Sequence, residues 1–400
     1  MKKKINEQIT ETIKKFINDF DLLLDDRISI FPKTKGIYLA YLNELKLNDK
    51  YAPSLIVNTI KDFQKYIKTC NTFDGLGLLV YTILFNKAYF EEETYEYLIK
   101  KFNSPILDRL TQKIEDIHEV EVMKGKICNL RLQLLIDPDF INSAIFKNRI
   151  TEIFSIVNFD NRLLPTWLDG SEKEVNFGFA HGLAGILNFY CILYEYNFHE
   201  KEQLRDNIEK LFSFIMIHTI SQTEYNLFAW PTSILKEDYL NNNYSTYNRY
   251  PLSWCYGISG LTVSLYRAAK ILELDDLGEG FINNILSSLE ILTKKDIFLS
   301  SMFCHGIGGV VVCLRILYTL SSDIRLLEWI NKILERFKHF YYDDQDVRER
   351  LINYDYDVER DCISESLSVD SLINGQISAI LSLLNLISDC QYFEYLVCLK

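Results

Sequence analysis

The segment GFAHGLAGILNFY, residues 178–190, places a glycine directly before a long apolar stretch of helical character. The same pattern occurs seven times along the chain, at Gly36, Gly75, Gly125, Gly182, Gly257, Gly306 and Gly375. Recurrence of one short unit is typical of repeat architectures, in which each repeat is a supersecondary element that stacks on its neighbours. The pattern therefore predicts an all-α protein built from repeated helical hairpins.

The spacing between successive glycines is 39 to 75 residues, which leaves room for one returning helix and a loop. Each repeat thus predicts an apolar inner helix followed by a more polar outer helix. Because glycine has no Cβ, the start of an inner helix can approach its neighbours or a central ligand closely. We expect a closed ring of seven hairpins with the glycine turns at one end. The alternative is an irregular helical protein with seven ordinary helix-start glycines.

Hydrophobic periodicity supports the helices. Apolar residues recur every three or four positions in several stretches, which are 5–23, 54–70, 92–118, 202–222, 276–294 and 324–340. Most prolines fall between these stretches, where helix breakers are expected. Two segments, 222–253 and 341–362, lack helical periodicity, and we expect them to be loops over the functional end.

Composition narrows the classes of function. The chain has 400 residues, of which 48% are hydrophobic and 24% are charged, so it can bury a core. We expect a single domain over residues 1–400. The net charge of −12 argues against nucleic acid and anionic membranes as partners, because both attract basic surfaces.

The sequence also predicts a cytoplasmic protein. Polar residues follow Lys2 to Lys4 where a secretion signal would be apolar, and no stretch reaches the length of a membrane span. The nine cysteines lie mostly in apolar surroundings, which indicates buried thiols rather than disulfides.

Two glycine turns carry residues of the kind that bind metals. Cys255 lies two residues before Gly257, and Cys304 with His305 directly precedes Gly306. Two thiolates and one imidazole would form a zinc site with an open fourth position, which is the catalytic type. The alternative is that both cysteines are core thiols and that His305 caps a helix.

His181 stands directly before Gly182 in a third turn. Since imidazole titrates near neutral pH, this side chain could donate or accept a proton. The alternative is a buried histidine bonded to a backbone carbonyl. The remaining histidines lie on polar helical stretches and are predicted to be surface residues: His118, His199, His218 and His339.

In this order, GFAHGLAG, WCYG and CHG resemble the signature of the lanthionine synthetase C-like family, the lanthipeptide cyclases. The resemblance covers most of the chain and extends to FPKTKGIYLAYL at 31–42, PTWL at 165–168 and SLINGQISAIL at 371–381. It implies an α/α toroid, a double barrel of seven inner and seven outer helices around a central zinc ion. It also implies cyclisation of a ribosomally made precursor peptide.

Transferred position by position, the resemblance makes Cys255, Cys304 and His305 the ligands of one Zn²⁺ ion and His181 the acid/base residue. The family commonly has an aspartate four residues before the glycine of the repeat at Gly125, and Glu121 stands here. The family also has an arginine four residues before the first zinc cysteine. That place is Pro251 here, and the nearest arginine is Arg249. Glu121 and Arg249 are therefore the further candidate catalytic residues.

The activity expected from the resemblance is the addition of peptide cysteine thiolates to dehydroalanine or dehydrobutyrine. The implied substrate is a dehydrated precursor peptide with leader and core. Because the sequence shows no kinase-type motifs, dehydration is expected to come from a separate dehydratase. We further expect a complex with that dehydratase and an export transporter, and peripheral association with a membrane-bound assembly.

Three alternatives remain. A related zinc protein could add glutathione or another free thiol to dehydrated residues. A non-catalytic scaffold of a peptide-modification complex would tolerate replacement of His181. An α/α-toroid glycosidase would need two opposed carboxylates in its cavity, and the glycine turns offer few.

Overall fold

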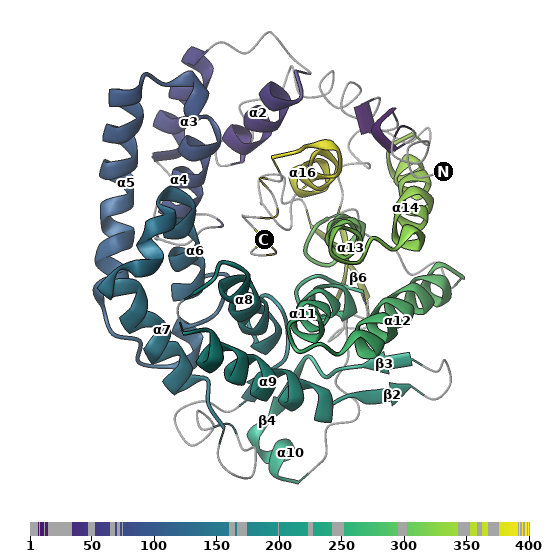
Figure 1. The fold of residues 1–400 in the computed structure, drawn as a ribbon. Coiled ribbons are helices and arrows are strands. Elements are labelled where there is room, and N and C mark those ends of the chain that lie inside the picture. The colour runs from purple at the N-terminus through teal and green to yellow at the C-terminus, as the bar shows by residue number, and fades with distance from the viewer. Residues whose placement is uncertain are drawn as a thin grey trace. The chain divides into compact units, whose positions relative to one another are not determined.

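A computed structural model describes the helices and turns that position the predicted site. Its described residues are 7, 9–11, 13–14, 34–46, 53–64, 69, 73, 75–159, 165, 174–198, 200–222, 227–241, 252–294, 302–342, 353–357, 362–366, 376–390, 392, 394, 397 and 399. The described part is mainly α-helical, as the sequence predicts (Figure 1). The chain divides into two compact units, Met1–Ser104 with Lys295–Val397, and Pro105–Lys294 with Cys398–Lys400.

The described residues of the first unit form helices and one two-stranded sheet. Its helices are α2 (Lys35–Glu44), α3 (Pro53–Gln64), α4 (Leu76–Phe85), η2 (Lys87–Tyr89), most of α5 (Glu92–Thr111), α13 (Ile307–Ser321), α14 (Ile324–Tyr342) and α16 (Gln376–Ile387). Strands β5 (Asn353–Asp357) and β6 (Cys362–Ser366) pair antiparallel. Helix α13 packs against both α14 and α16, and α2 packs against α3, α4 and α16 (Figure 1).

The second unit carries His181 and Cys255. Its helices are η3 (Ile117–Glu119), α6 (Lys126–Ile136), η4 (Pro138–Asn142), α7 (Ala144–Ile156), α8 (Leu183–Glu195), α9 (Lys201–Ile217), α10 (Lys236–Leu240), α11 (Ile258–Ile271) and α12 (Asp275–Lys294). Its described residues also form two short sheets, β1 (Glu174–Asn176) with β4 (Ser233–Leu235), and β2 (Ile220–Gln222) with β3 (Leu227–Ala229). Helices α8 and α11 lie side by side, and each also packs against the helix that follows it (Figure 1).

The repeated glycines begin helices. Five of them are the N-cap residues of α4, α6, α8, α11 and α13, namely Gly75, Gly125, Gly182, Gly257 and Gly306. Gly36 is instead the second residue of α2, after the N-cap Thr34. Gly375 lies outside the described residues. The repeat pattern is therefore confirmed at five positions, each with the glycine in extended backbone.

Burial separates two kinds of helix. Every residue from Leu183 to Leu193 of α8 is buried, and so is every residue from Ile258 to Ala269 of α11. The helices that follow, α9 and α12, each pair a buried stripe with exposed charged residues. This difference confirms that an apolar helix is followed by a more polar one. The toroid of seven inner and seven outer helices, and the single domain over 1–400, remain predictions.

The prediction of a loop over 222–253 is wrong. Within 222–253, predicted as a loop, the structure places β3, β4 and α10. Strands of three residues are too short for their alternation to stand out from the sequence. The error matters because β4 pairs with β1, directly before the segment that carries His181.

The remaining differences are local. Helix α9 ends at Ile217 and α5 at Thr111, although the apolar periodicity extends to 222 and 118. The prediction of a loop over 341–362 is also wrong for its described residues, which belong to the end of α14, to β5 and to the start of β6. Large aromatic side chains fill the spaces between helices, as predicted, and Phe179, Tyr190 and Trp254 are among those fully buried. Among the described helices, none is both long and apolar enough to cross a membrane.

Candidate active site

The turn that carries His181 is fixed by the strand before it and by two glycines. Strand β1 ends at Asn176, whose side-chain Oδ1 accepts a hydrogen bond from the Gly178 N–H at 2.9 Å. A Cβ at Gly182 would lie 2.3 Å from the Asn176 carbonyl oxygen, so only glycine permits this approach. A Cβ at Gly178 would lie 2.5 Å from the ring of Tyr256. Helix α8 then begins at Leu183, one residue beyond the turn.

Backbone hydrogen bonds join the His181 turn to the Cys255 turn. The N–H groups of Phe179 and Ala180 both donate to the carbonyl oxygen of Cys255, at 2.6 and 3.2 Å. Phe179 also packs against Trp254, with ring centroids 5.5 Å apart. Two segments more than 70 residues apart in the sequence are thus held next to each other. Consequently, the position of the imidazole is coupled to the position of the first predicted zinc cysteine.

His181 and Glu121 form a hydrogen-bonded pair. The imidazole Nδ1 lies 2.9 Å from Oε2 of Glu121. The same carboxylate accepts the backbone N–H groups of Met123 at 2.9 Å and Lys124 at 2.6 Å. Because the carboxylate oxygen is an acceptor, the ring proton of this pair lies on Nδ1 and Nε2 is left for chemistry. The structure therefore brings together two residues that the sequence predicted as catalytic.

The imidazole opens onto a cavity. The side chain of His181 is 35% exposed, whereas that of Glu121 is 9% exposed. A cavity of about 380 Å³ has both residues in its wall. Other wall residues come from η3, the turn after it, β1, α8 and the Cys255 turn: Ile117, His118, Lys124, Glu174, Asn176, Leu183, Ile186 and Tyr256. A buried carboxylate behind an accessible imidazole suits proton transfer to a bound molecule.

Cys255 lies in a compact turn at the start of α11. Its side chain is buried, and its Sγ lies 3.8 Å from the hydroxyl of Ser253. Ser253 also accepts hydrogen bonds from the N–H groups of Tyr256, through its hydroxyl, and Gly257, through its carbonyl. A Cβ at Gly260 would lie 2.1 Å from the Trp254 carbonyl, so a glycine is needed in the first turn of this helix.

Cys304 and His305 lie in the turn that precedes α13, with Gly306 as its N-cap. The N–H of Phe303 donates to the Ser378 hydroxyl of α16 at 3.0 Å, which anchors this turn. Cys304 is buried, and His305 is partly exposed.

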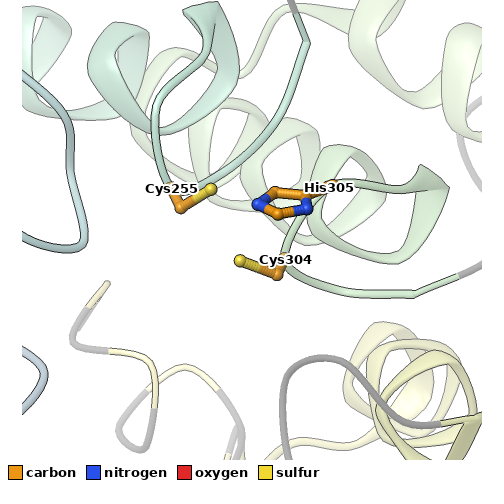
Figure 2. A group of neighbouring side chains, drawn as sticks. All are labelled: Cys255, Cys304 and His305. Atoms are coloured by element: carbon orange, nitrogen blue, oxygen red, sulfur yellow. The ribbon is translucent and has the colours of Figure 1, made fainter. Parts of the chain in front are cut away.

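Cys255, Cys304 and His305 form a group that could hold a metal ion (Figure 2). One ligand atom from each residue lies within 4.8 Å of the other two. Two zinc-bound sulfurs at about 2.3 Å from the ion in tetrahedral geometry are separated by about 3.8 Å, which falls within this limit. Two sulfurs and one imidazole nitrogen are also the donor types that zinc prefers. The residues present therefore fit a zinc ion with one open coordination position.

The other predicted residues have different outcomes. Arg249 and His199 lie outside the described residues, as does the side chain of His339. His118 is exposed, as predicted. The prediction that His218 is a surface residue is wrong, because it is 4% exposed at the end of α9. Its Nδ1 lies 2.7 Å from the Phe214 carbonyl oxygen, and its ring packs against Phe177, Phe214 and Tyr239.

Sequence reasoning missed several residues of the cavity wall. Tyr256 follows Cys255 directly in the WCYG motif, and its ring centroid lies 6.2 Å from that of His181. Its position next to Cys255 in the sequence could have identified it as a residue of the site. Asn176 and Glu174 belong to β1, whose pairing with β4 had no signal in the sequence. The thiols of Cys128, Cys191 and Cys313 are buried, as expected.

Comparison with known proteins agrees with this geometry. Residues 35–389 match the family model described as lanthionine synthetase C-like protein, so the chain belongs to this family. A solved structure named nisin cyclase is similar over 98% of this chain and 97% of its own, with a TM-score of 0.68 and 18% sequence identity. At that identity, the similarity shows a shared fold.

Proposed function

We propose that this protein is a zinc-dependent lanthipeptide cyclase with an α/α-toroid fold. The observation that carries the proposal is the group formed by Cys255, Cys304 and His305. Membership of the lanthionine synthetase C-like family and the fold shared with nisin cyclase support it. The reaction adds a cysteine thiolate of a peptide to dehydroalanine or dehydrobutyrine, and the product is a lanthionine or methyllanthionine ring.

Cys255, Cys304 and His305 would hold one zinc ion. When bound, the ion supplies a site at which the substrate thiol is deprotonated, a step that costs about 2 kcal/mol in water at pH 7 for a thiol with a pKa near 8.5. Two thiolates and a neutral imidazole leave little net positive charge at the site. We infer that the substrate sulfur therefore stays nucleophilic.

His181 would protonate the substrate carbon. As the sulfur bonds to the β-carbon, the C=C π electrons move to the α-carbon and form an enolate. The Nε2–H of the His181 imidazolium gives its proton to the α-carbon and completes the addition. The proton lost from the thiol balances the proton gained at carbon, so the reaction needs no oxidant or reductant.

Glu121 would position His181 rather than transfer the proton itself. Its carboxylate is held by the N–H groups of Met123 and Lys124 and faces Nδ1 of the ring. This contact fixes the orientation of the ring. Arg249, as the nearest arginine to the first zinc cysteine in sequence, would stabilise or orient the enolate.

The substrate and partners follow from the proposed reaction. The substrate is a dehydrated precursor peptide with its leader and core, and a separate dehydratase supplies it. We propose that the protein acts in the cytoplasm, in a complex with that dehydratase and an export transporter at the membrane.

A thiol-alkylation assay tests the proposal. The zinc-loaded protein is incubated with a dehydrated precursor peptide, and a thiol-specific alkylating reagent is then added. The mass of the peptide is measured by mass spectrometry. Cyclisation leaves the mass of the peptide unchanged but protects each ring thiol from alkylation. A peptide that remains fully alkylated after incubation with the protein would contradict the proposal. If added glutathione is joined to the peptide in place of ring closure, the protein is a thiol-adding relative instead.

A further inference from the structure

The turn that carries Glu121 is attached to the end of helix α5 by two basic side chains. Residues Val120 to Gly125 connect η3 with α6, and the Ile127 N–H donates to the Val120 carbonyl at 3.3 Å across this turn. Arg109, in the last turn of α5, donates from Nη2 to the carbonyl of Lys124 at 2.9 Å. Lys126, the first residue of α6, donates from Nζ to the carbonyls of Arg109 and Gln112, both at 2.8 Å.

This arrangement satisfies groups that a helix end leaves unpaired. The last carbonyls of an α-helix have no partner within the helix, and the helix dipole makes that end negative. Lys126 is only 2% exposed, and its ammonium group donates to the carbonyl of Arg109, which also accepts the Gln112 N–H, and to the carbonyl of Gln112, the first residue beyond α5. Arg149 of α7 donates to the Gln112 carbonyl as well. Arg109 and Lys126 thus join the end of α5 to the Glu121 turn and the start of α6.

The Glu121 turn also has little freedom on its other sides. A Cβ at Gly125 would lie 2.3 Å from the Glu121 carbonyl oxygen and 2.7 Å from that of Glu119, so the turn is tightly folded on itself. A Cβ at Gly185 of α8 would lie 3.0 Å from both methyl groups of Val122. The turn therefore packs against the helix that follows His181. A shift of its backbone would be transmitted to the carboxylate, because Glu121 is bound to the N–H groups of this same turn.

We infer that Lys126 and Arg109 are positioning residues, which set the Glu121 carboxylate against Nδ1 of His181 from the end of α5. The expected effect on catalysis rests on the proposed function. The positioning of the Glu121 carboxylate by these two side chains does not depend on that function. Neither side chain needs to touch the substrate. Lys126 holds the start of α6 against the end of α5 through its bonds to the Arg109 and Gln112 carbonyls. Arg109 holds the Glu121 turn through its bond to the Lys124 carbonyl.

The test compares Lys126→Met with Lys126→Arg and with Lys270→Met. Methionine keeps the apolar stem and removes the ammonium group, whereas arginine keeps the charge. Lys270→Met is the matched control, because Lys270 bonds to Asp275 at 2.8 Å on the exposed surface. Two quantities are measured on the zinc-loaded full chain. One is the downfield NMR signal of the His181 Nδ1–H, and the other is the pair kcat and KM for ring formation.

The inference predicts that Lys126→Met weakens or abolishes the Nδ1–H signal and lowers kcat about tenfold with KM unchanged. Lys126→Arg should restore both quantities to more than half of the wild-type values, and Lys270→Met should change neither. If folded Lys126→Met keeps the signal and kcat of the wild type, the inference is overturned. If Lys126→Met does not fold, Arg109→Gln decides by the same two measurements.

The two readouts separate the inference from the proposed function. A wild-type protein without cyclase activity would contradict the proposed function, and the NMR signal would still test whether Lys126 and Arg109 position Glu121. Retained cyclase activity with an unchanged signal in Lys126→Met or Arg109→Gln would overturn only the inference.

Discussion

His181 and His218 lie in the same unit of the molecule and show how surroundings decide what a histidine can do. His181 faces a carboxylate and is open to a cavity, whereas His218 faces a backbone carbonyl and is enclosed by three aromatic rings. Burial among apolar rings disfavours the charged form of an imidazole. Accordingly, burial lowers the pKa of His218, with the Phe214 carbonyl acting in the opposite direction. The first environment suits proton transfer and the second suits packing.

Replacing His181 and replacing His218 should differ most in their effect on the rate of ring formation. His181→Ala should lower the rate of ring formation by about 10²–10⁴-fold, because the donor for the α-carbon is lost. His218→Phe keeps an aromatic ring in the enclosed position and should leave that rate unchanged. The thiol-alkylation assay measures both variants under the same conditions. A His181→Ala protein that cyclises at the wild-type rate would show that His181 is not the proton donor.

A smaller catalytic effect is expected from the partner of His181. Glu121→Gln keeps the size of the side chain but removes its charge, so it should lower kcat about tenfold, which corresponds to about 1.4 kcal/mol of charge-assisted hydrogen bonding. Glu174→Gln is the matched control, since Glu174 is a second carboxylate in the wall of the cavity. Its kcat should equal that of the wild type. An equal loss in both variants would indicate an effect of cavity charge rather than of the His181–Glu121 pair.

The fold of the Glu121 turn can be tested through stability. Gly125→Ala should lower the free energy of unfolding by about 1–3 kcal/mol, because a Cβ there would overlap the backbone of Glu121 and Glu119. Gly280→Ala in α12 should instead raise it by about 0.5–1 kcal/mol, since no atom lies within 4 Å of the added Cβ and alanine favours a helix. Urea unfolding measures both variants. Equal effects at the two glycines would mean that the turn is not tightly packed.

The smallest expected effect is a pH dependence from His218. Its pKa in the folded protein is below the unfolded value of about 6.5, so the unfolded chain binds more protons as the pH falls through that value. His218 therefore stabilises the folded state above about pH 6.5, and this contribution is lost below it. The free energy of unfolding should fall less steeply between pH 7 and pH 5 in His218→Phe than in the wild type. Parallel pH profiles would contradict this assignment.

The sequence predicts the helices and the main site residues because both depend on local signals. Apolar periodicity and the glycine at each helix start identify α8, α11 and α13, and motifs next to those glycines identify His181, Cys255 and Cys304. Glu121 is a candidate only through the family resemblance, in which an aspartate stands four residues before the glycine that is Gly125 here. Its bond to His181, 60 residues away, is a tertiary contact that needs coordinates.

The features that sequence reasoning missed depend on contacts between distant segments. The strand β4 has three residues, and its pairing with β1 is what defines it. His218 ends a helix with charged residues along its exposed side, which favoured a surface prediction. Its burial comes from Phe177 and Tyr239, which lie on segments before α8 and after β4. Likewise, Lys126 reads as an ordinary surface lysine until the end of α5 is placed beside it.

The metal content of the purified protein tests the central claim most directly. We predict about one zinc per chain in the wild type, and loss of that zinc in Cys304→Ala. Cys313→Ala is the matched control, because Cys313 is a buried thiol of α13 whose pKa is raised by burial, and this variant should keep the zinc. A wild-type chain that binds no zinc, or a Cys304→Ala chain that retains it fully, would contradict the account.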